Sequence, residues 1–415
     1  MSSSPIAAVD VVVTNPMQAP LGNFVLVQIR TEDGLTGWGD ATCSGSELAV
    51  ATMLEEHLAP ALLGEPVSNI ERLWHRLYHL PYYRSGSVHM SAISGIDMAL
   101  WDIKGQRAGM PVCDLLGGRV RDRMLTYRSV SGRSFEEVGD RAEELSESGY
   151  RVIKVQAAVP ELEGGYAVPQ TDSQKAVAAE AFERGVPPAE TWDPDLYANM
   201  LPRFFEFLSE RFGDDITWIH DVHERVTPSQ ALRLAHDLEP FGLFYLEDLL
   251  RPEHLDTFRL VRQQSSTPLA MGEVFCNPWE GQELWLDHLI DYARHDLAHI
   301  GGITAARKVA AACETRGVLT AWHGPGNISP IAHMANAHVS LAVPNFGIQE
   351  FDANWWGEPI REVFSTVPEV TEGHVTVPLS SGLGCHVDID AARRFPYVRR
   401  MRPAIRRVDG TPWAY

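Results

Sequence analysis

Three short apolar runs in the middle of the chain each end in an acidic residue. The runs are ITWIHD, FGLFYLE and TPLAMGE, and they end at Asp221, Glu247 and Glu273, at intervals of 26 positions. A strand, a helix and two short loops occupy about that length, so the interval is typical of successive βα units. In a barrel of such units the carboxyl ends of the strands open on one face, where we expect the three carboxylates to converge. Converging carboxylates repel one another, and Mg²⁺, which prefers oxygen ligands, would remove that repulsion.

Side chains with acid–base chemistry lie close to these acids or at the end of a similar run. His223 follows Asp221 by two positions, and because strand side chains alternate we expect both to point to the same face, with His223 as a proton donor. Lys154 lies near the end of the run YRVIKVQ, and Tyr166 lies in the loop after it. A free phenol has a pKa near ~10, and a neighbouring ammonium favours the phenolate, so Lys154 and Tyr166 are a candidate base pair.

Three more polar residues come at later strand ends, namely Arg294, His323 and Glu350. Arg294 would supply positive charge for a substrate carboxylate or hydroxyl. Together these groups suit proton abstraction next to a carboxylate, because a bound Mg²⁺ stabilises the enediolate that results. If His223 then protonates a departing β-hydroxyl, the net reaction is dehydration of a sugar acid to a 2-keto-3-deoxy acid. Taken singly, each residue also has a plainer interpretation as a surface acid, a structural histidine or a loop aromatic.

The elements that must position these residues fall into a cap and a barrel. Residues 1–123 predict an α+β capping domain, with strands at 6–13 and 23–30, a hairpin turn in EDGLTGWGD, and helices at 46–63, 69–80 and 90–108. From Leu125 onward, strands and helices alternate in eight units, the count of a (β/α)₈ barrel, which we place at 124–375. Residues 157–191 form a long insertion with little periodicity. The segment 376–415 is basic and irregular, and we expect it to return to the cap.

Composition narrows the class of protein and its partners. The chain has 415 residues, 45% of them hydrophobic, and a formal net charge of −20, which argues against nucleic acid or an anionic membrane as partner. Five scattered cysteines without CxxC spacing indicate reduced thiols in a cytoplasmic protein. No apolar run reaches the ~18 residues of a membrane span, and MSSSPIAAVDVVV lacks the features of a signal peptide. A small molecule is therefore the expected partner.

Several segments resemble the mannonate dehydratase group of the enolase superfamily, which includes D-gluconate dehydratases and the so-called starvation-sensing proteins. They are DVHERVTP, FYLEDLL, LAMGEVF, HGPGNISP and PNFGIQEF, and the likeness extends from SAISGIDMALWDIKG to DGTPW near the end of the chain. The resemblance implies an α+β N-terminal capping domain and a modified TIM barrel of the (β/α)₇β type, one helix fewer than the count above. It also implies Mg²⁺ and a homo-oligomer.

The resemblance assigns roles by position. It implies that the metal ligands are Asp221, Glu247 and Glu273, that His223 is the acid and that Tyr166 is the base. It implies substrate contacts at Arg294, His323, Glu350 and, in DGTPW, Trp413.

Four positions differ from the mannonate-processing pattern. Lys154 replaces the arginine beside the tyrosine and keeps its charge without the fork geometry. Ser44 and Ser129 stand where a cap asparagine and a barrel histidine meet the sugar, and Asn327 stands where an aspartate follows HGP by two positions. These three changes remove polar reach from the sugar pocket, so we expect D-mannonate to be a poor substrate.

The sequence therefore predicts an Mg²⁺-dependent acid-sugar dehydratase, with D-gluconate or D-mannonate as the type of substrate. A second enzymatic hypothesis is racemisation or epimerisation, with Tyr166 and His223 on opposite faces of C2. A third hypothesis is a regulatory or binding protein that keeps the fold without turnover, for which the changes at Ser44, Ser129 and Asn327 are the motive. A metal-dependent barrel hydrolase is disfavoured because no HxH pair follows the first barrel strand.

Overall fold

The structure is a computed structural model that describes residues 4–18, 22–162, 165–352, 355–399 and 402–413. The chain divides into two compact units. The first unit contains Met1–Leu125, Gly272–Gln282 and Arg294–Arg400, and the second contains Thr126–Met271, Glu283–Ala293 and Met401–Tyr415. Both units combine segments that are far apart in the sequence. The domain limits predicted at 123 and 375 are limits along the sequence, and they stay a prediction.

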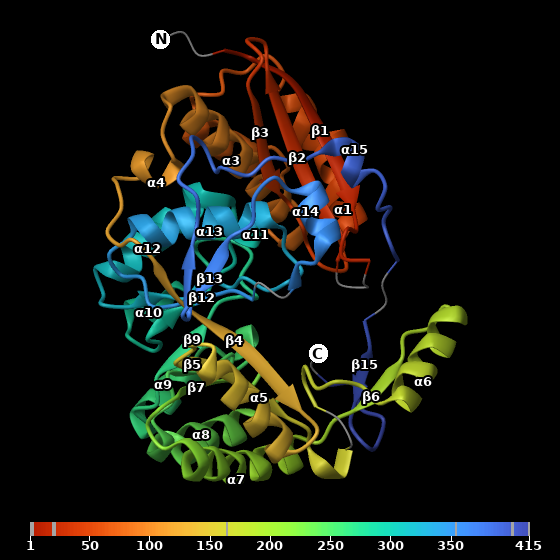
Figure 1. Ribbon diagram of the computed structural model, residues 1–415, viewed down its shortest axis with the longest axis vertical. Helices are drawn as coiled ribbons and strands as arrows, with labels where there is room; N and C mark the ends of the chain where they lie inside the picture. Colours follow the sequence, from red (N-terminus) through yellow and green to blue (C-terminus); the bar gives the residue numbers. More distant parts are fainter. Residues whose placement is uncertain (1–3, 19–21, 163–164, 353–354, 400–401, 414–415) are drawn as a thin grey trace. The chain divides into compact units, whose positions relative to one another are not determined.

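The first unit begins with an antiparallel sheet of three strands in sequential order, β1 (Ile6–Thr14), β2 (Phe24–Thr31) and β3 (Thr36–Asp40) (Figure 1). Its helices are α1 (Glu47–Thr52), η1 (Met53–Leu58), η2 (Ala59–Ala61), α2 (Ile70–His79), α3 (Ser87–Ala108) and α4 (Val112–Leu115). The hairpin turn predicted in this segment lies between β2 and β3, and the rest of the segment, from Thr36 onward, forms β3 itself. A Cβ on Gly37 or Gly39 would collide with carbonyl oxygens of α3, so two glycines let this strand pack directly on the helix.

The later segments of the first unit include helices that pack against the N-terminal helices α2, α3 and α4. They form α11 (Leu297–Ile300), α12 (Gly302–Glu314), β11 (Leu319–Thr320), α13 (Pro330–Ala342), β12 (Gln349–Glu350), α14 (Glu358–Val363), β13 (Glu369–Thr371), β14 (His374–Thr376) and α15 (Ile389–Ala392). Two indole N–H groups fix the packing: Trp74 donates to the carbonyl of Gly301 at 2.8 Å, and Trp101 donates to the hydroxyl of Thr304 at 2.8 Å. The cap and the segment after α11 thus share one core.

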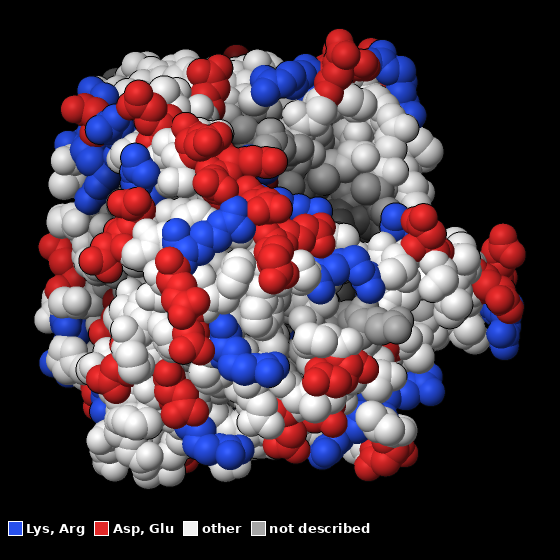
Figure 2. Space-filling model, turned by 60° about the horizontal axis from the view of Figure 1, so that its bottom comes forward, with Lys and Arg blue, Asp and Glu red and all other residues white. Residues whose placement is uncertain are grey.

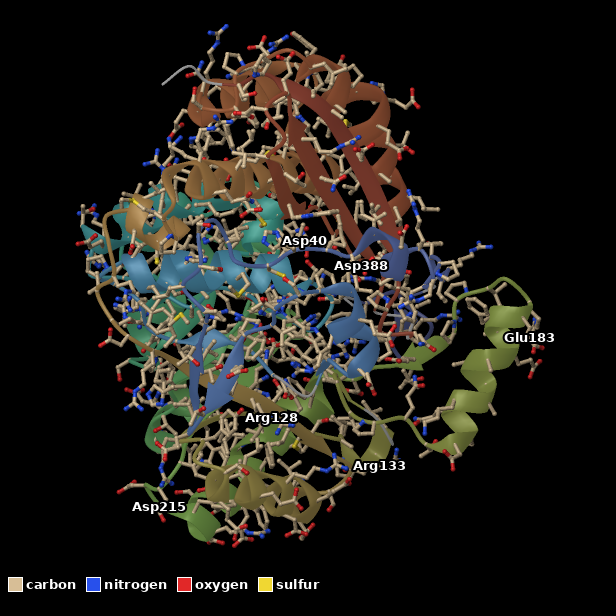
Figure 3. The ribbon with its side chains drawn as sticks, turned by 45° about the horizontal axis from the view of Figure 1, so that its top comes forward. Asp40, Arg128, Arg133, Glu183, Asp215 and Asp388 are labelled. Atoms are coloured by element: carbon tan, nitrogen blue, oxygen red, sulfur yellow. The ribbon has the colours of Figure 1, made fainter. Side chains whose placement is uncertain are left out.

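The second unit contains six strands that pair in parallel in the order β4, β5, β7, β8, β9, β10. Their bounds are β4 (Met124–Gly132), β5 (Val152–Ala157), β7 (Thr217–Asp221), β8 (Tyr245–Glu247), β9 (Leu269–Met271) and β10 (Tyr292–Ala293). The connecting helices are α5 (Phe135–Glu147), α7 (Pro194–Phe212), α8 (Pro228–Asp237), η4 (Glu239–Phe241), η5 (Pro252–His254), α9 (Thr257–Gln264) and α10 (Gln282–Leu286). Figure 3 labels Arg133, just after β4, and Asp215, just before β7, at opposite ends of these strands. Alternating strands and helices of this kind are what the sequence predicts.

The insertion between β5 and α7 is more ordered than its sequence predicts. It contains η3 (Pro160–Leu162), α6 (Asp172–Glu183) and β6 (Ala189–Thr191), and β6 pairs in parallel with β15 (Ala404–Arg406). The helix α6 begins at a capping box, in which Thr171 and Gln174 bond reciprocally. None of the twelve residues of α6 is buried, so its sequence needs no apolar stripe and has only a weak one. Periodicity alone therefore did not predict this helix.

Surface charge is mixed in sign. Figure 2 shows acidic and basic side chains interspersed on one face, without a continuous basic area. Among the helices that the structure describes, none combines the length and the apolar character that a membrane crossing requires.

Candidate active site

Three carboxylates meet at the ends of two neighbouring strands of the second unit. Asp221 is the last residue of β7, Glu247 is the last residue of β8, and Asp248 follows it. The strands bring Asp221 and Glu247 into register as direct partners. One oxygen from each of the three carboxylates lies within 4.8 Å of the other two, and each residue is at most 1% exposed. We call this group the acid cluster.

Lys154, on β5, supplies positive charge to the acid cluster. Its Nζ lies 3.4 Å from Glu247 Oε1 and 3.8 Å from Asp221 Oδ2, and the residue is buried. The three carboxylates and this ammonium carry a formal charge of −2, which is costly in a buried place. A hard divalent cation balances that charge, and an all-oxygen donor set suits Mg²⁺. The residues present therefore fit a magnesium ion.

His223 lies near Asp221, but not by strand alternation. β7 ends at Asp221, and His223 and Glu224 have φ angles of +52° and +60°. Two successive residues in the left-handed region make a turn, which the amide of Glu224 fixes by donating to the carbonyl of Asp248 at 2.8 Å. The expectation that alternation aims His223 is wrong, because the strand stops two residues earlier. The turn positions the imidazole instead.

Tyr166 contacts this turn from the insertion. Its ring stacks on the ring of His223, with 3.9 Å between centroids and 24° between planes. The guanidinium of Arg225 lies 4.9 Å from the centroid of the same ring. The structure thus brings the predicted base and the predicted acid into direct contact. It also adds a cation, Arg225, that the sequence did not indicate.

A second group of polar residues lies in the first unit, and we call it the ion-pair network. Arg294 follows β10 and is fully buried. Its Nη2 donates to Glu350 Oε2 at 2.6 Å and lies 3.5 Å from Glu273 Oε2. The amide of Gly324 also donates to Glu350 Oε2, at 3.0 Å. Glu273, the last acid of the 26-residue series, therefore belongs to a group that carries its own cations.

His323 is the second cation of the ion-pair network. Its Nδ1 lies 2.7 Å from Asp296 Oδ2, and its Nε2 lies 3.5 Å from Glu273 Oε2. Burial opposes the charged imidazole, but Glu273 and Asp296 outweigh burial and raise the pKa of His323 to about 9. Burial likewise opposes the charged form of Asp296, but His299 and His323 hold the pKa of this carboxyl below its usual value. The carboxylates of Glu273 and Asp296 therefore favour the imidazolium form of His323.

Two of the predicted sugar contacts lie on loops that are tied together. Asp40, labelled in Figure 3, ends β3, and its Oδ2 accepts from the amide of Ser329 at 2.6 Å, at the start of α13. Ser44 lies four positions after Asp40, and Asn327 lies two positions before Ser329; both are half-buried. A carboxylate at a helix N-terminus stabilises that end of the helix, so this bond holds both loops.

The last two predicted contacts lie in the second unit. Ser129 is exposed on β4, where it pairs in register with Lys154. Trp413 is half-buried, and its indole N–H donates to the carbonyl of Arg225 at 3.0 Å. Neither position is tested for sugar binding, and both stay predictions.

Sequence reasoning missed three residues of these groups. Asp248 stands beside Glu247 in the segment LEDLL, but its φ of +44° aims it in a way that no pattern predicts. Asp296 had a usable signal, since it precedes a short helix and accepts from Ala298 N as an N-cap. Arg225 had only its closeness to Asp221.

Comparison with known families agrees with this geometry. Residues 6–117 match the N-terminal domain of the mandelate racemase / muconate lactonizing enzyme family, and residues 137–392 match the family described as enolase C-terminal domain-like. The chain therefore has the capping domain and the barrel domain of the enolase superfamily, as the sequence predicts.

Full-length relatives narrow the family. A D-galactonate dehydratase family member from Streptomyces bingchenggensis is 43% identical over 98% of both chains. A D-mannonate dehydratase from Rhizorhabdus wittichii is 40% identical over 98% of this chain and 99% of its own. The crystal structure of an enolase from Pantoea ananatis with bound D-gluconate and magnesium has a TM-score of 0.89 and 39% identity, covering 99% of this chain and 100% of that one. Because the match to named dehydratases runs through both domains, the chain belongs to the enolase superfamily and, within it, to the family of acid-sugar dehydratases.

Proposed function

We propose that the protein is an Mg²⁺-dependent dehydratase that converts a sugar acid of the D-gluconate or D-mannonate type to a 2-keto-3-deoxy acid. The observation that carries the proposal is the acid cluster, in which three buried carboxylates lie together and two of them, Asp221 and Glu247, lie near the Lys154 ammonium. Relatives named as D-galactonate and D-mannonate dehydratases support the reaction, and the neighbouring structure with D-gluconate and magnesium supports the ligand class.

The acid cluster is the proposed metal site. Asp221 and Glu247 would hold the ion, and Glu273 stays the third ligand that the sequence predicts, with Asp248 as a further acid that the structure adds. Bound Mg²⁺ would stabilise the negative charge that develops on the substrate carboxylate when a neighbouring proton leaves. Lys154 reduces the repulsion between Asp221 and Glu247 in the meantime.

Proton transfer falls to the stacked pair. Tyr166, as phenolate, takes the proton from C2, and the electrons of the broken C2–H bond move onto the substrate carboxylate, which gives an enediolate. These electrons then form a C2–C3 double bond as the C3–O bond breaks. His223 gives its proton to the departing C3 hydroxyl, which leaves as water, and the enol then tautomerises to the 2-keto acid. The ion-pair network supplies the other proposed contacts to the sugar acid, through Arg294, His323 and Glu350.

The contact between Tyr166 and His223 favours dehydration over racemisation. A two-base racemase needs its two groups on opposite faces of C2, with the substrate carbon between them. Rings that stack with centroids 3.9 Å apart leave no room for a carbon between them. Both groups therefore approach a substrate from one side, which suits removal of a proton and a hydroxyl from neighbouring carbons.

A screen of acid sugars with Mg²⁺ tests the proposal, with formation of 2-keto-3-deoxy product as the measurement. We expect product with at least one hexonate, and less with D-mannonate than with its best competitor. Solvent deuterium at C2 of recovered substrate, without loss of water, would establish the racemase instead. Saturable binding of a sugar acid with a blank product screen would establish a binding protein without turnover.

A further inference from the structure

Arg225 is a buried cation on the turn that carries His223. The residue is 4% exposed, and its amide donates to the carbonyl of Val222 at 3.2 Å. A buried guanidinium costs free energy unless neighbouring groups compensate for the lost water. The groups that surround it therefore show what this arginine does.

Two aromatic rings, one in the insertion and one directly after it, lie against the guanidinium. The ring centroid of Tyr166 is 4.9 Å from the guanidinium carbon, and the ring centroid of Trp192 is 5.0 Å from it. Cations within about 6 Å of an aromatic face are attracted by the ring, more strongly where water is excluded. Tyr166 lies near the start of the insertion and Trp192 directly after its end, so one side chain contacts both ends.

The backbone of Arg225 makes a second set of contacts. Its carbonyl oxygen accepts the indole N–H of Trp192 at 2.9 Å and that of Trp413 at 3.0 Å. The two indoles come from segments that are themselves joined, because Trp192 N donates to Arg406 O at 2.8 Å and Trp413 N donates to Ile405 O at 2.9 Å. The end of the insertion and the C-terminal segment are thus both hydrogen-bonded to Arg225.

The helix of the insertion, α6, adds no buried residue to this anchoring. Figures 1 and 3 show it extending away from the strands, with Glu183 at its far end. A cavity of about 270 Å³ lies among the residues of the insertion, with Arg225 and Ile405 on its wall. Packing within the insertion is therefore loose, and a loosely packed segment opens at low cost in free energy.

The geometry points to Arg225 as the residue that positions Tyr166. Its guanidinium holds the phenol ring against His223, while its carbonyl anchors both the insertion and the C-terminal segment to the end of β7. The consequence for turnover rests on the proposed function, because only there does Tyr166 remove a proton. The anchoring itself does not depend on any activity.

The test compares Arg225→Met with Arg225→Lys and with a control, Arg407→Met. Arg407 lies 5.4 Å from the ring of Trp413 and so loses a similar contact without reaching Tyr166. In Arg225→Met we expect hydrogen exchange of the peptide around Tyr166 to rise at least ~10-fold. We expect kcat to fall about 100-fold, since small displacements of a reacting group cost that much, while KM changes less than about 3-fold. Arg225→Lys keeps the charge without the planar group, so it should give a smaller change in the exchange rate and in kcat. The control, Arg407→Met, should match the wild type in both measurements.

The two readouts separate this proposal from the proposed function. If the wild type turns over no sugar acid, the proposed function fails, yet faster exchange in Arg225→Met still supports the anchoring. Exchange and kcat in Arg225→Met that equal those of the wild type would overturn the role of Arg225. If Arg225→Met does not fold, Trp192→Phe takes its place, because this substitution removes one indole N–H bond to the carbonyl of Arg225. Hydrogen exchange that is unchanged in both Trp192→Phe and Arg225→Lys would also overturn the proposal.

Discussion

The charged residues of the acid cluster and of the ion-pair network lie in different compact units, and the two groups neutralise their charges differently. In the ion-pair network, Arg294 and His323 each meet a carboxylate at 2.6 or 2.7 Å, and Glu273 lies 3.5 Å from both cations. In the acid cluster, two of the three carboxylates, those of Glu247 and Asp221, lie 3.4 and 3.8 Å from Lys154 Nζ. The network is organised by its own ion pairs, whereas the cluster carries negative charge that an added cation would balance. Mutations that remove one carboxylate should therefore have opposite effects on stability in the two groups.

The largest effect is expected in the acid cluster, with Asp221→Asn. The substitution removes a proposed metal ligand, and we expect kcat/KM to fall by about 1000-fold or more because charge stabilisation is lost. The metal-free protein should become more stable, since one buried negative charge is gone. Thermal unfolding with Mg²⁺ and with a chelator measures both effects. A wild type whose Tm does not respond to Mg²⁺, or a variant that keeps the response, would contradict this account.

The next effect is expected in the ion-pair network, with Glu350→Gln. Here the loss of one carboxylate leaves the fully buried Arg294 without its 2.6 Å partner, so the free energy of unfolding should fall by roughly 3–5 kcal/mol. The matched control is Glu362→Gln, which breaks an exposed pair with Arg394 at 2.6 Å and should cost less than about 1 kcal/mol. Urea unfolding of the three proteins gives the comparison, and equal costs for the two variants would show that burial does not set the difference.

Asp97 is a buried carboxylate outside the acid cluster and the ion-pair network, and its pKa can be compared with that of Asp296. Burial raises the pKa of Asp97 to about 7, although Thr304 donates to it, whereas the histidines beside Asp296 lower the pKa of that carboxyl. Folded protein therefore keeps the Asp97 proton up to about pH 7, and unfolded chains release it near pH ~4. The resulting stability is present at low pH and lost as the pH rises through 7, by about 3 kcal/mol between pH 5 and 8 at ~1.4 kcal/mol per pKa unit. Asp97→Asn should remove that part of the pH dependence of the free energy of unfolding, which urea unfolding at several pH values measures. A variant with the same pH dependence as the wild type would contradict this prediction.

The sequence was informative where chemistry depends on local pattern. Two apolar runs that end in an acid correctly predicted that Asp221 and Glu247 are the last residues of strands, β7 and β8. The reason is that a parallel strand buried on both faces has a nearly continuous apolar sequence. The cap and barrel followed from the same periodicity and from the family resemblance.

The features of the site that the sequence did not predict depend on backbone conformation and on contacts between residues far apart in the chain. The left-handed turn at His223 and the φ of Asp248 replace the alternation of a strand, and no side-chain pattern encodes them. The contacts of Arg225 join positions 166, 192 and 413, which come together only in the fold. The positions of residues on continuous strands were therefore predictable, whereas the turn that carries His223 and the contacts of Tyr166 with His223 and Arg225 were not.

The smallest effect expected is that of Asp248→Asn, which asks whether the acid that the sequence missed takes part in metal binding. Its carboxylate belongs to the cluster, but Glu273 is the third ligand that the 26-residue interval predicts. If Asp248 orients or neutralises the ligands without being one, its loss should weaken Mg²⁺ binding by about 10-fold, while Glu273→Gln weakens it further. Calorimetric titration of Mg²⁺ into both variants and the wild type measures the order. A larger loss for Asp248→Asn than for Glu273→Gln would transfer the third ligand to Asp248. Glu273 would then act only through Arg294 and His323, and the acid cluster of the second unit would suffice to bind the ion.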